Sequence, residues 1–237
     1  MIAERSRATL LILFSACCFG SIGILTTLAL NAGARLIDVL VWRYVIAAVL
    51  LVVVSGGLPA FRAVGRRGIS ITAFTGVGQA TIAFVTLSSL KYLPAATVTF
   101  LFYTYPAWVA VISAVRGVER LTAPRAIALV LSLVGLTLMV GMPGSGGLHP
   151  VGVALALSAA FLYAIYIPMI NHFGIRVPPA VTSTFASGGA AIVLIVASLF
   201  QGGLRFDFAP VAWASMVTLA ILCTVIAFIL FLRGLAI

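Results

Sequence analysis

The chain has 237 residues, of which 63% are hydrophobic and 8% charged, and its formal net charge is +10 at pH 7. A soluble globular domain is excluded, because such domains are about 45–50% apolar and about 25% charged and cannot bury this much apolar surface. The positive charge does not indicate binding to nucleic acid, because the arginines lie in short segments between apolar runs, where basic residues set membrane topology.

Eight apolar stretches follow one another along the chain, each close to the length of about 20 residues that crosses a bilayer as a helix. They cover residues 8–30, 36–56, 69–90, 95–115, 123–142, 151–171, 178–200 and 210–232. Short connectors that contain Gly, Pro or Asn separate several of them. The sequence therefore predicts an all-α, polytopic transmembrane bundle of about eight helices, with the lipid bilayer as its surroundings.

The basic residues also predict the orientation of the bundle. With the N-terminus in the cytoplasm, ten of the 14 lysines and arginines fall in inside segments and three in outside loops. The remaining one, Arg43, lies within the second span. Because cytoplasmic loops are enriched in Lys and Arg, we expect a multi-pass protein of the cell inner membrane with a cytoplasmic N-terminus.

An internal repeat is indicated by similar segments about 143 to 145 residues apart. The segment TIAF at 81–84 resembles TVIAF at 224–228, and the sixth span aligns with the first. The repeating unit then has five helices, and an odd number forces the second copy into the membrane upside down, as in secondary transporters. We expect a first module over 8–142 and a partial second module over 151–237, which holds the first three helices of a C-terminally truncated copy.

Three motifs resemble the EamA-type family of the drug/metabolite transporter superfamily. They are FYTYP at 102–106, GVERLT at 117–122 and Trp-Arg-Tyr at 42–44. The first two are similar to the family's fourth helix with its central proline and to the turn that follows it, and the third to its helix-two arginine. The resemblance implies ten helices in two inverted halves, both termini in the cytoplasm, and export or uptake of small metabolites without a cofactor.

Two residues within the spans have a functional and a structural interpretation. Pro106 lacks an N–H to pair with the carbonyl of Phe102, so it predicts a hinge or an exposed carbonyl, or else a static kink. Arg43 lies roughly 8 Å inside the second span at 1.5 Å per residue. It would attract a carboxylate or phosphate of the substrate, or it would reach back to the interface and satisfy carbonyls at the helix end.

Few other polar or small residues lie deep in the spans. The candidates for lining a substrate cavity, besides Arg43 and Pro106, are Gly20, Gln79, Tyr103, Tyr163 and Tyr166. The alternative for the glycine is close helix packing, and the alternative for the tyrosines is the interfacial aromatic belt.

Glu119 and Arg120 predict a turn or an ion pair at the cytoplasmic end of the fourth span, and a gating ion pair is the alternative. No metal site is expected, because the three cysteines form no CxxC pair and have no histidine at ligand spacing. His149 and His172 are both expected in loops. No carboxylate lies deep in a span, which favours a facilitator or exchanger over a proton-coupled pump.

The leading hypothesis is a transporter of small metabolites, an exporter or facilitator of amino-acid-like or drug-like solutes, that works by alternating access between inverted halves. A non-transporting assembly or receptor subunit is the second hypothesis, and it predicts no central polar cavity. An intramembrane enzyme is the third, but the spans hold no arrangement of nucleophile and base. We therefore expect no enzyme, a small-molecule substrate of unknown identity and no nucleic-acid partner, and the oligomeric state stays open.

Overall fold

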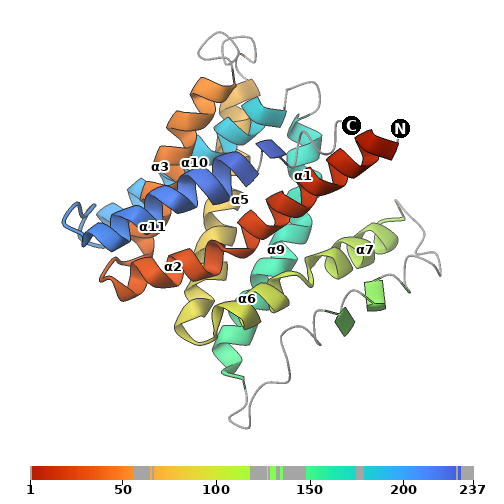
Figure 1. The fold of residues 1–237 in the computed structure, drawn as a ribbon, viewed down its shortest axis with the longest axis horizontal. Helices are drawn as coiled ribbons and strands as arrows, with labels where there is room; N and C mark the ends of the chain where they lie inside the picture. The colour runs from red at the N-terminus through yellow and green to blue at the C-terminus, as the bar shows by residue number, and fades with distance from the viewer. Residues whose placement is uncertain are drawn as a thin grey trace. The chain divides into compact units, whose positions relative to one another are not determined.

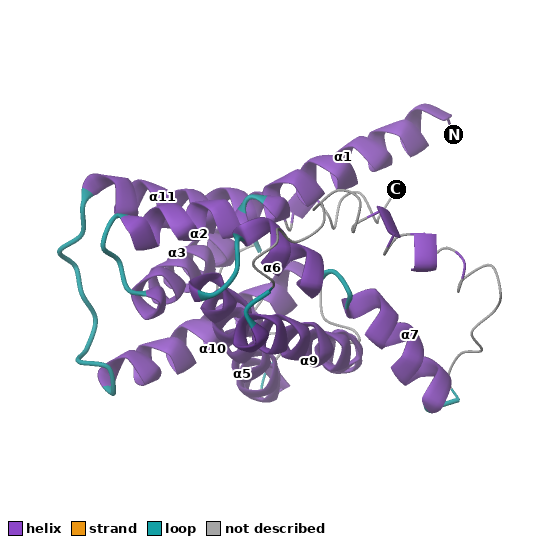
Figure 2. Ribbon diagram, turned by 90° about the horizontal axis from the view of Figure 1, so that it is seen from below, coloured by secondary structure: helices purple, strands orange, loops and turns teal. Residues whose placement is uncertain are grey.

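The protein was analysed as a computed structural model. The structure describes residues 2–55, 65, 67–117, 127, 129–131, 134–135, 148–174, 179–227 and 229–230. Within these ranges every regular element is a helix and no strand occurs (Figure 2). The predicted all-α polytopic bundle is confirmed.

The helices follow the predicted apolar stretches. They are α1 (Ile2–Gly20), α2 (Ile22–Asn31), α3 (Leu36–Val54), α5 (Arg67–Ser88), η1 (Ser89–Lys91), α6 (Ala95–Phe102), α7 (Tyr105–Val115), α9 (Pro150–Gly174), α10 (Pro179–Leu199), α11 (Pro210–Ala220) and the π-helix η2 (Ile221–Ile226). Six helical segments among the described residues are long and apolar enough to cross a membrane, and Pro210–Ile226 is a shorter apolar helix. Of the predicted span 123–142, the structure describes only residues 127, 129–131 and 134–135, all helical.

The first predicted span is confirmed as one apolar helical segment, Thr9–Asn31, with the single turn residue Ser21 between α1 and α2. The backbone hydrogen bonds continue through this turn, from the N–H of Ser21 to the carbonyl of Cys17 and from the N–H of Leu25 to the carbonyl of Ser21. One other prediction was wrong in detail. His172, expected in a loop, belongs to α9, which continues to Gly174 through the internal Pro168.

The chain forms two compact units, and each is described by itself. Unit 1 comprises residues 1–80 and 170–237, and unit 2 comprises residues 81–169. These units are not the predicted modules, 8–142 and 151–237, which stay a prediction. Both α5 and α9 contribute residues to each unit.

In unit 1, α3 packs against α10, and α11 packs against α2 and α3 (Figure 1). A core of small and sulfur-containing side chains lies where α2, α3 and α11 meet, and it includes Ala29, Val39, Ala212, Met216 and Cys223. Small residues bring helix backbones close together, which is the usual way helices associate where lipid removes the hydrophobic driving force.

In unit 2, the start of α6 packs against α9. Leu93, Val98, Leu101 and Ala156 form its buried core. Near one end of α9 the ring of His149 stacks on Tyr92, with their centroids 4.6 Å apart. This packing fixes α6 and the first half of α9 as one body.

Candidate functional site

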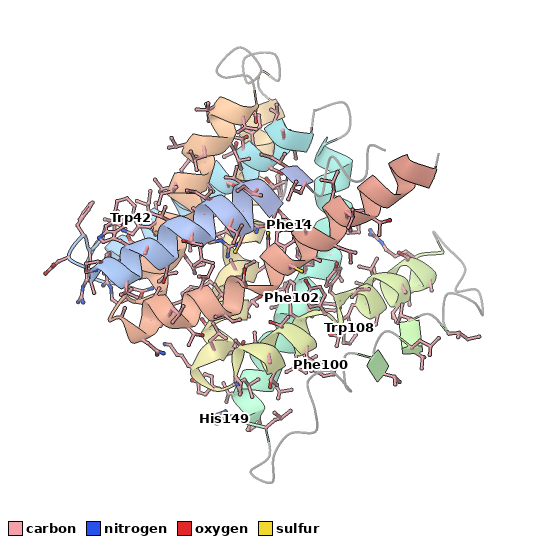
Figure 3. The ribbon with its side chains drawn as sticks, viewed as in Figure 1. Phe14, Trp42, Phe100, Phe102, Trp108 and His149 are labelled. Carbon is pink, nitrogen blue, oxygen red and sulfur yellow. The ribbon has the colours of Figure 1, made fainter. Side chains whose placement is uncertain are left out.

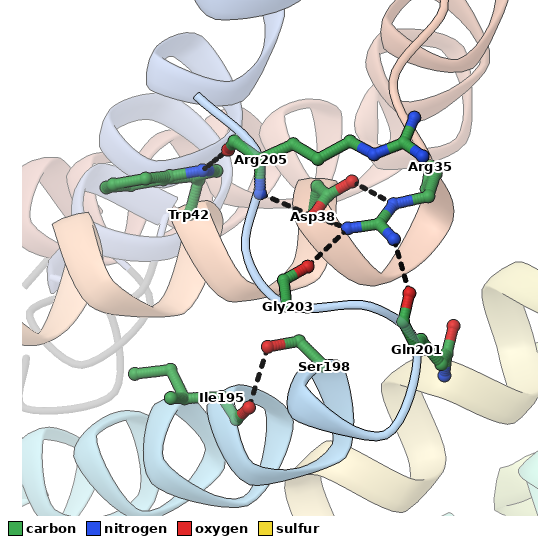
Figure 4. Close-up of polar contacts among 8 residues, drawn as sticks. All are labelled: Arg35, Asp38, Trp42, Ile195, Ser198, Gln201, Gly203 and Arg205. Atoms are coloured by element: carbon green, nitrogen blue, oxygen red, sulfur yellow. Dashed lines mark hydrogen bonds and ion pairs between the residues drawn. The ribbon is translucent and has the colours of Figure 1, made fainter. Parts of the chain in front are cut away.

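An ion pair at the start of α3 holds the loop between α10 and α11 (Figure 4). The Arg35 guanidinium donates from Nε and Nη2 to the two carboxylate oxygens of Asp38, at 2.6 and 2.8 Å. Its Nη1 and Nη2 also donate to the carbonyls of Gln201 and Gly203, at 2.7 and 2.6 Å. We name this set of contacts the Arg35–Asp38 clasp; it ties the α10–α11 loop to the first turn of α3.

The clasp places a fully buried carboxylate at the start of a helix. Asp38 is 0% exposed, and its Oδ1 also accepts from the backbone N–H of Arg205 at 3.4 Å. Negative charge is favoured in the first turn of a helix, where backbone N–H groups lack partners. The hydrogen bond to Asp38 raises the pKa of Arg35 above its ordinary value, so the guanidinium stays charged.

Aromatic rings extend the clasp toward α11. The indole N–H of Trp42 donates to the carbonyl of Arg205 at 3.2 Å, and its ring meets Trp213 edge-on at a centroid distance of 5.0 Å. Phe206 meets the same indole at 5.2 Å. These contacts fix α3 relative to α11, so the residues that follow on the two helices keep a defined register.

The polar residues deeper in unit 1 gather around Arg43. Arg43 is 6% exposed, and its Nε donates to the hydroxyl of Thr224 on η2 at 3.0 Å. Its guanidinium carbon lies 5.3 Å from the ring centroid of Tyr44, within the range of a cation–π contact. The side-chain amide of Gln79, on α5, donates to the hydroxyl of Tyr44 at 2.9 Å. Two of the predicted cavity residues, Arg43 and Gln79, thus converge on Tyr44, and we name these four residues the Arg43 cluster.

Gly20, another predicted cavity residue, also lies in unit 1 and is exposed. It ends α1, and a Cβ built on it would meet nothing within 4 Å. Its neighbour Ser21 forms a hydrogen bond of 3.3 Å with Cys223, the residue before Thr224. Close packing therefore does not require the glycine at this position, and its role in a cavity stays a prediction.

In unit 2, the three tyrosines predicted to line a cavity belong to one aromatic cluster. The Tyr163 ring lies 4.8 Å from Tyr105, 5.2 Å from Phe102 and 6.1 Å from Tyr166, measured between centroids. Tyr103 joins through Phe102 and Tyr105, at 6.3 and 6.2 Å. Figure 3 labels Phe102, on α6, and Trp108, on α7, whose ring meets Phe161 edge-on at 5.5 Å. Faces and edges of aromatic rings bind apolar, aromatic or cationic groups.

The helix is interrupted beside Pro106, as the missing N–H predicts. The chain leaves the α-helix at Tyr103 and Thr104, and α7 begins at Tyr105 with the proline in its first turn. The carbonyl of Leu101 accepts both the N–H and the hydroxyl of Thr104, at 3.3 and 2.7 Å. Pro106 is itself exposed. The break agrees with either a hinge or a static kink.

Sequence reasoning missed Tyr44, Thr224, Phe102 and Tyr105 as members of these clusters. Tyr44 was visible in the Trp-Arg-Tyr motif and Tyr105 in the FYTYP motif, so both could have been found. Thr224 meets Arg43 across 181 residues of sequence, and no local pattern predicts such a contact. Glu119 and Arg120 lie outside the described residues. Whether the Arg43 cluster and the aromatic cluster line one cavity stays a prediction.

Comparisons with known proteins concern the family and the fold of the chain. The family model described as the EamA-like transporter family matches residues 6–141 and 150–237. A crystal structure described only as that of a protein is similar over 97% of this chain and 79% of its own, with a TM-score of 0.74 and 20% sequence identity. At that identity the likeness concerns the fold alone. No curated protein sequence matches the chain.

Proposed function

Because this chain belongs to the EamA-like transporter family, we propose that it carries amino-acid-like or drug-like metabolites across the inner membrane by alternating access. The chain is a multi-pass membrane protein, and its family is one of transporters. Export or facilitated passage, two inverted halves that move about a central site, and a cytoplasmic N-terminus complete the proposal. We further propose that it catalyses no chemical reaction.

The observation that carries the proposal is that one family model matches the chain twice, over 6–141 and over 150–237. A first half of five spans would place the second half in the opposite orientation. Two related halves of opposite orientation give a site near the midplane that is open to either side in turn.

Two features supply what such a motion needs. The interruption at Tyr103 and Thr104 divides a membrane helix into two segments that can change their angle. A few element-terminal residues that absorb such changes are the usual form of a hinge. The aromatic cluster around Tyr163 offers an apolar surface with hydroxyl groups, which suits mixed apolar and polar metabolites.

Transport is tested with the purified full chain in proteoliposomes loaded with a mixture of labelled amino acids. We expect release of one or more of them down their gradient, faster than from protein-free liposomes, and equally fast without an imposed pH gradient. Release that occurs only with a pH gradient would contradict the facilitated mechanism. No release of any solute would favour the assembly or receptor subunit.

A matched pair of variants connects transport to the aromatic cluster. Tyr163→Ala removes the ring that joins three others, and we expect it to change the relative rates among solutes. Phe161→Ala removes an exposed ring on the same helix that contacts Trp108 instead. Equal effects of the two changes would mean that the cluster does not contact the solute.

A further inference from the structure

The Arg43 cluster contains a buried positive charge without a negative partner among the described residues. The carboxylate nearest in sequence, Asp38, is held by Arg35 through two hydrogen bonds. Asp207 lies exposed in the α10–α11 loop. A charge inside a membrane protein is costly unless it is paired, and such residues usually mark a ligand pathway.

The contacts that Arg43 does make are with neutral groups and leave most of its donors unused. A guanidinium has five N–H donors, and Thr224 receives the one on Nε. The hydroxyl proton of Thr224 is itself given to the carbonyl of Leu219 at 3.1 Å, so its oxygen serves Arg43 as an acceptor. Tyr44 offers the face of its ring. The four N–H bonds on Nη1 and Nη2 have no protein acceptor in the part of the chain that the structure describes.

These terminal nitrogens are not sealed inside the protein. Among the described residues, the only fully enclosed side-chain polar atom without a partner is Oγ1 of Thr26. Nη1 and Nη2 therefore keep accessible surface, although the residue as a whole is 6% exposed.

The side chain also points away from the end of α3 where the clasp lies. Arg43 is seven residues into α3, about 10 Å along it, whereas Thr224 is 14 residues beyond the start of α11, about 21 Å along. Trp42, the residue before Arg43, meets Trp213 near the start of α11, so Thr224 lies further along α11 than the level of Arg43. The bond to Thr224 thus draws the Arg43 side chain away from the clasp, and whether it reaches an interface stays a prediction.

We infer that the Arg43 cluster binds a small oxyanion, the carboxylate or phosphate group of a solute, through Nη1 and Nη2 of Arg43. The planar fork of a guanidinium matches two oxygens of such a group, and fixing Nε on Thr224 orients the fork in advance. This inference rests on the proposed transport function and names the charge of its substrate, which carries an anionic group.

The test compares an anion with a neutral molecule of nearly the same shape, and adds phosphate as a second anion. Thermal unfolding of the full chain in detergent is measured with benzoate, with benzamide and with inorganic phosphate, because a ligand that binds the folded state raises its Tm. We expect benzoate or phosphate to raise the Tm and benzamide to leave it unchanged. Equal shifts with benzoate and benzamide, or no shift with any of the three, would overturn the inference.

Variants then assign the binding to Arg43. Arg43→Gln should weaken benzoate or phosphate binding about tenfold or more, as expected for the loss of charge-assisted hydrogen bonds. Arg205→Ala, which removes an exposed arginine whose recorded contacts are through its backbone, should leave it unchanged. If Arg43→Gln does not fold, the wild-type protein is modified with phenylglyoxal in the presence and absence of benzoate. We expect benzoate to protect Arg43 from modification and to leave Arg205, the internal control, unprotected. Failure to protect Arg43 would contradict the inference.

An anionic lipid headgroup would supply the same chemistry from another source. Nanodiscs of phosphatidylglycerol and of phosphatidylcholine distinguish a lipid headgroup from a soluble solute. If phosphatidylglycerol raises the Tm and no soluble oxyanion does, the inference that a solute binds at Arg43 is overturned. Binding is measured here without transport, so failure of transport leaves this result standing. Transport of anionic solutes that is unchanged in Arg43→Gln would contradict the inference and leave the proposed function intact.

Discussion

A Cβ built on Gly76 of α5 would lie 2.5 Å from the Cα of Gly189 on α10, a distance that real side chains do not reach. A Cβ built on Gly189 would in turn meet the carbonyl oxygen of Thr72. The two backbones of unit 1 therefore touch at these glycines, and the close approach depends on both.

We expect Gly189→Ala to lower the free energy of unfolding by about 1–3 kcal/mol, because the backbone of α5 would have to move to admit the methyl group. Gly188→Ala is the matched control, since a Cβ at that position meets nothing within 4 Å. Alanine there should be neutral or slightly stabilising, because it favours the helix more than glycine does. Thermal unfolding in detergent measures the stability of both variants. An equal Tm for the two would contradict the close contact of α5 and α10 at Gly76 and Gly189.

The Arg35–Asp38 clasp should determine how firmly the α10–α11 loop is held. Asp38→Asn removes the charge from the pair, and we expect a loss of about 1–2 kcal/mol after allowance for the partial exposure of Arg35. Hydrogen exchange of the loop amides, read by mass spectrometry, should become faster. Arg205→Ala should change neither quantity, because the backbone of that residue makes the contacts.

Pro106 allows a distinction between a hinge and a static kink. Pro106→Ala restores an N–H donor beside the interruption, so a continuous helix becomes more favourable. If the interruption moves during transport, we expect a rate about tenfold lower, the effect of about 1.4 kcal/mol in the barrier, with an unchanged or higher Tm. Pro168→Ala, in the uninterrupted α9, is the control. An unchanged rate in Pro106→Ala would favour the static kink.

The predicted orientation can be tested by chemical labelling. In a background without Cys17, Cys18 and Cys223, Gln201→Cys and Arg116→Cys place single thiols at exposed positions. A membrane-impermeant maleimide applied to intact cells should label position 201 at once and position 116 after permeabilisation only. The reverse pattern would mean that the N-terminus is not cytoplasmic.

The positions of the helices could be predicted from the sequence, because a bilayer requires about 20 apolar residues and the chain supplies them in separate runs. The interruption before Pro106 could be predicted as well, since a proline cannot donate a backbone hydrogen bond. The family was also recognisable, and its membership is confirmed.

The interior contacts could not be predicted in the same way. Arg43 and Thr224, and Ser15 and the carbonyl of Ala227, are separated by 181 and 212 residues. Apolar helices carry little periodic signal, because residues facing lipid are as hydrophobic as those facing the core. The π-helix after α11 had no sequence signal that we recognised, and the turn residue Ser21 within the first span was missed for the same reason.

The π-helix η2 has a consequence for motion along α11. A π-helical turn holds one residue more than an α-helical turn. If Ile221–Ile226 tightened into a regular α-helix, the chain beyond it would rotate by about 100° about its axis and shift by about 1.5 Å. The Ala227 carbonyl would then leave the Ser15 hydroxyl, 2.7 Å away, and Thr224 would turn relative to Arg43. A shift of one residue in η2 would thus separate Thr224 from the guanidinium of Arg43.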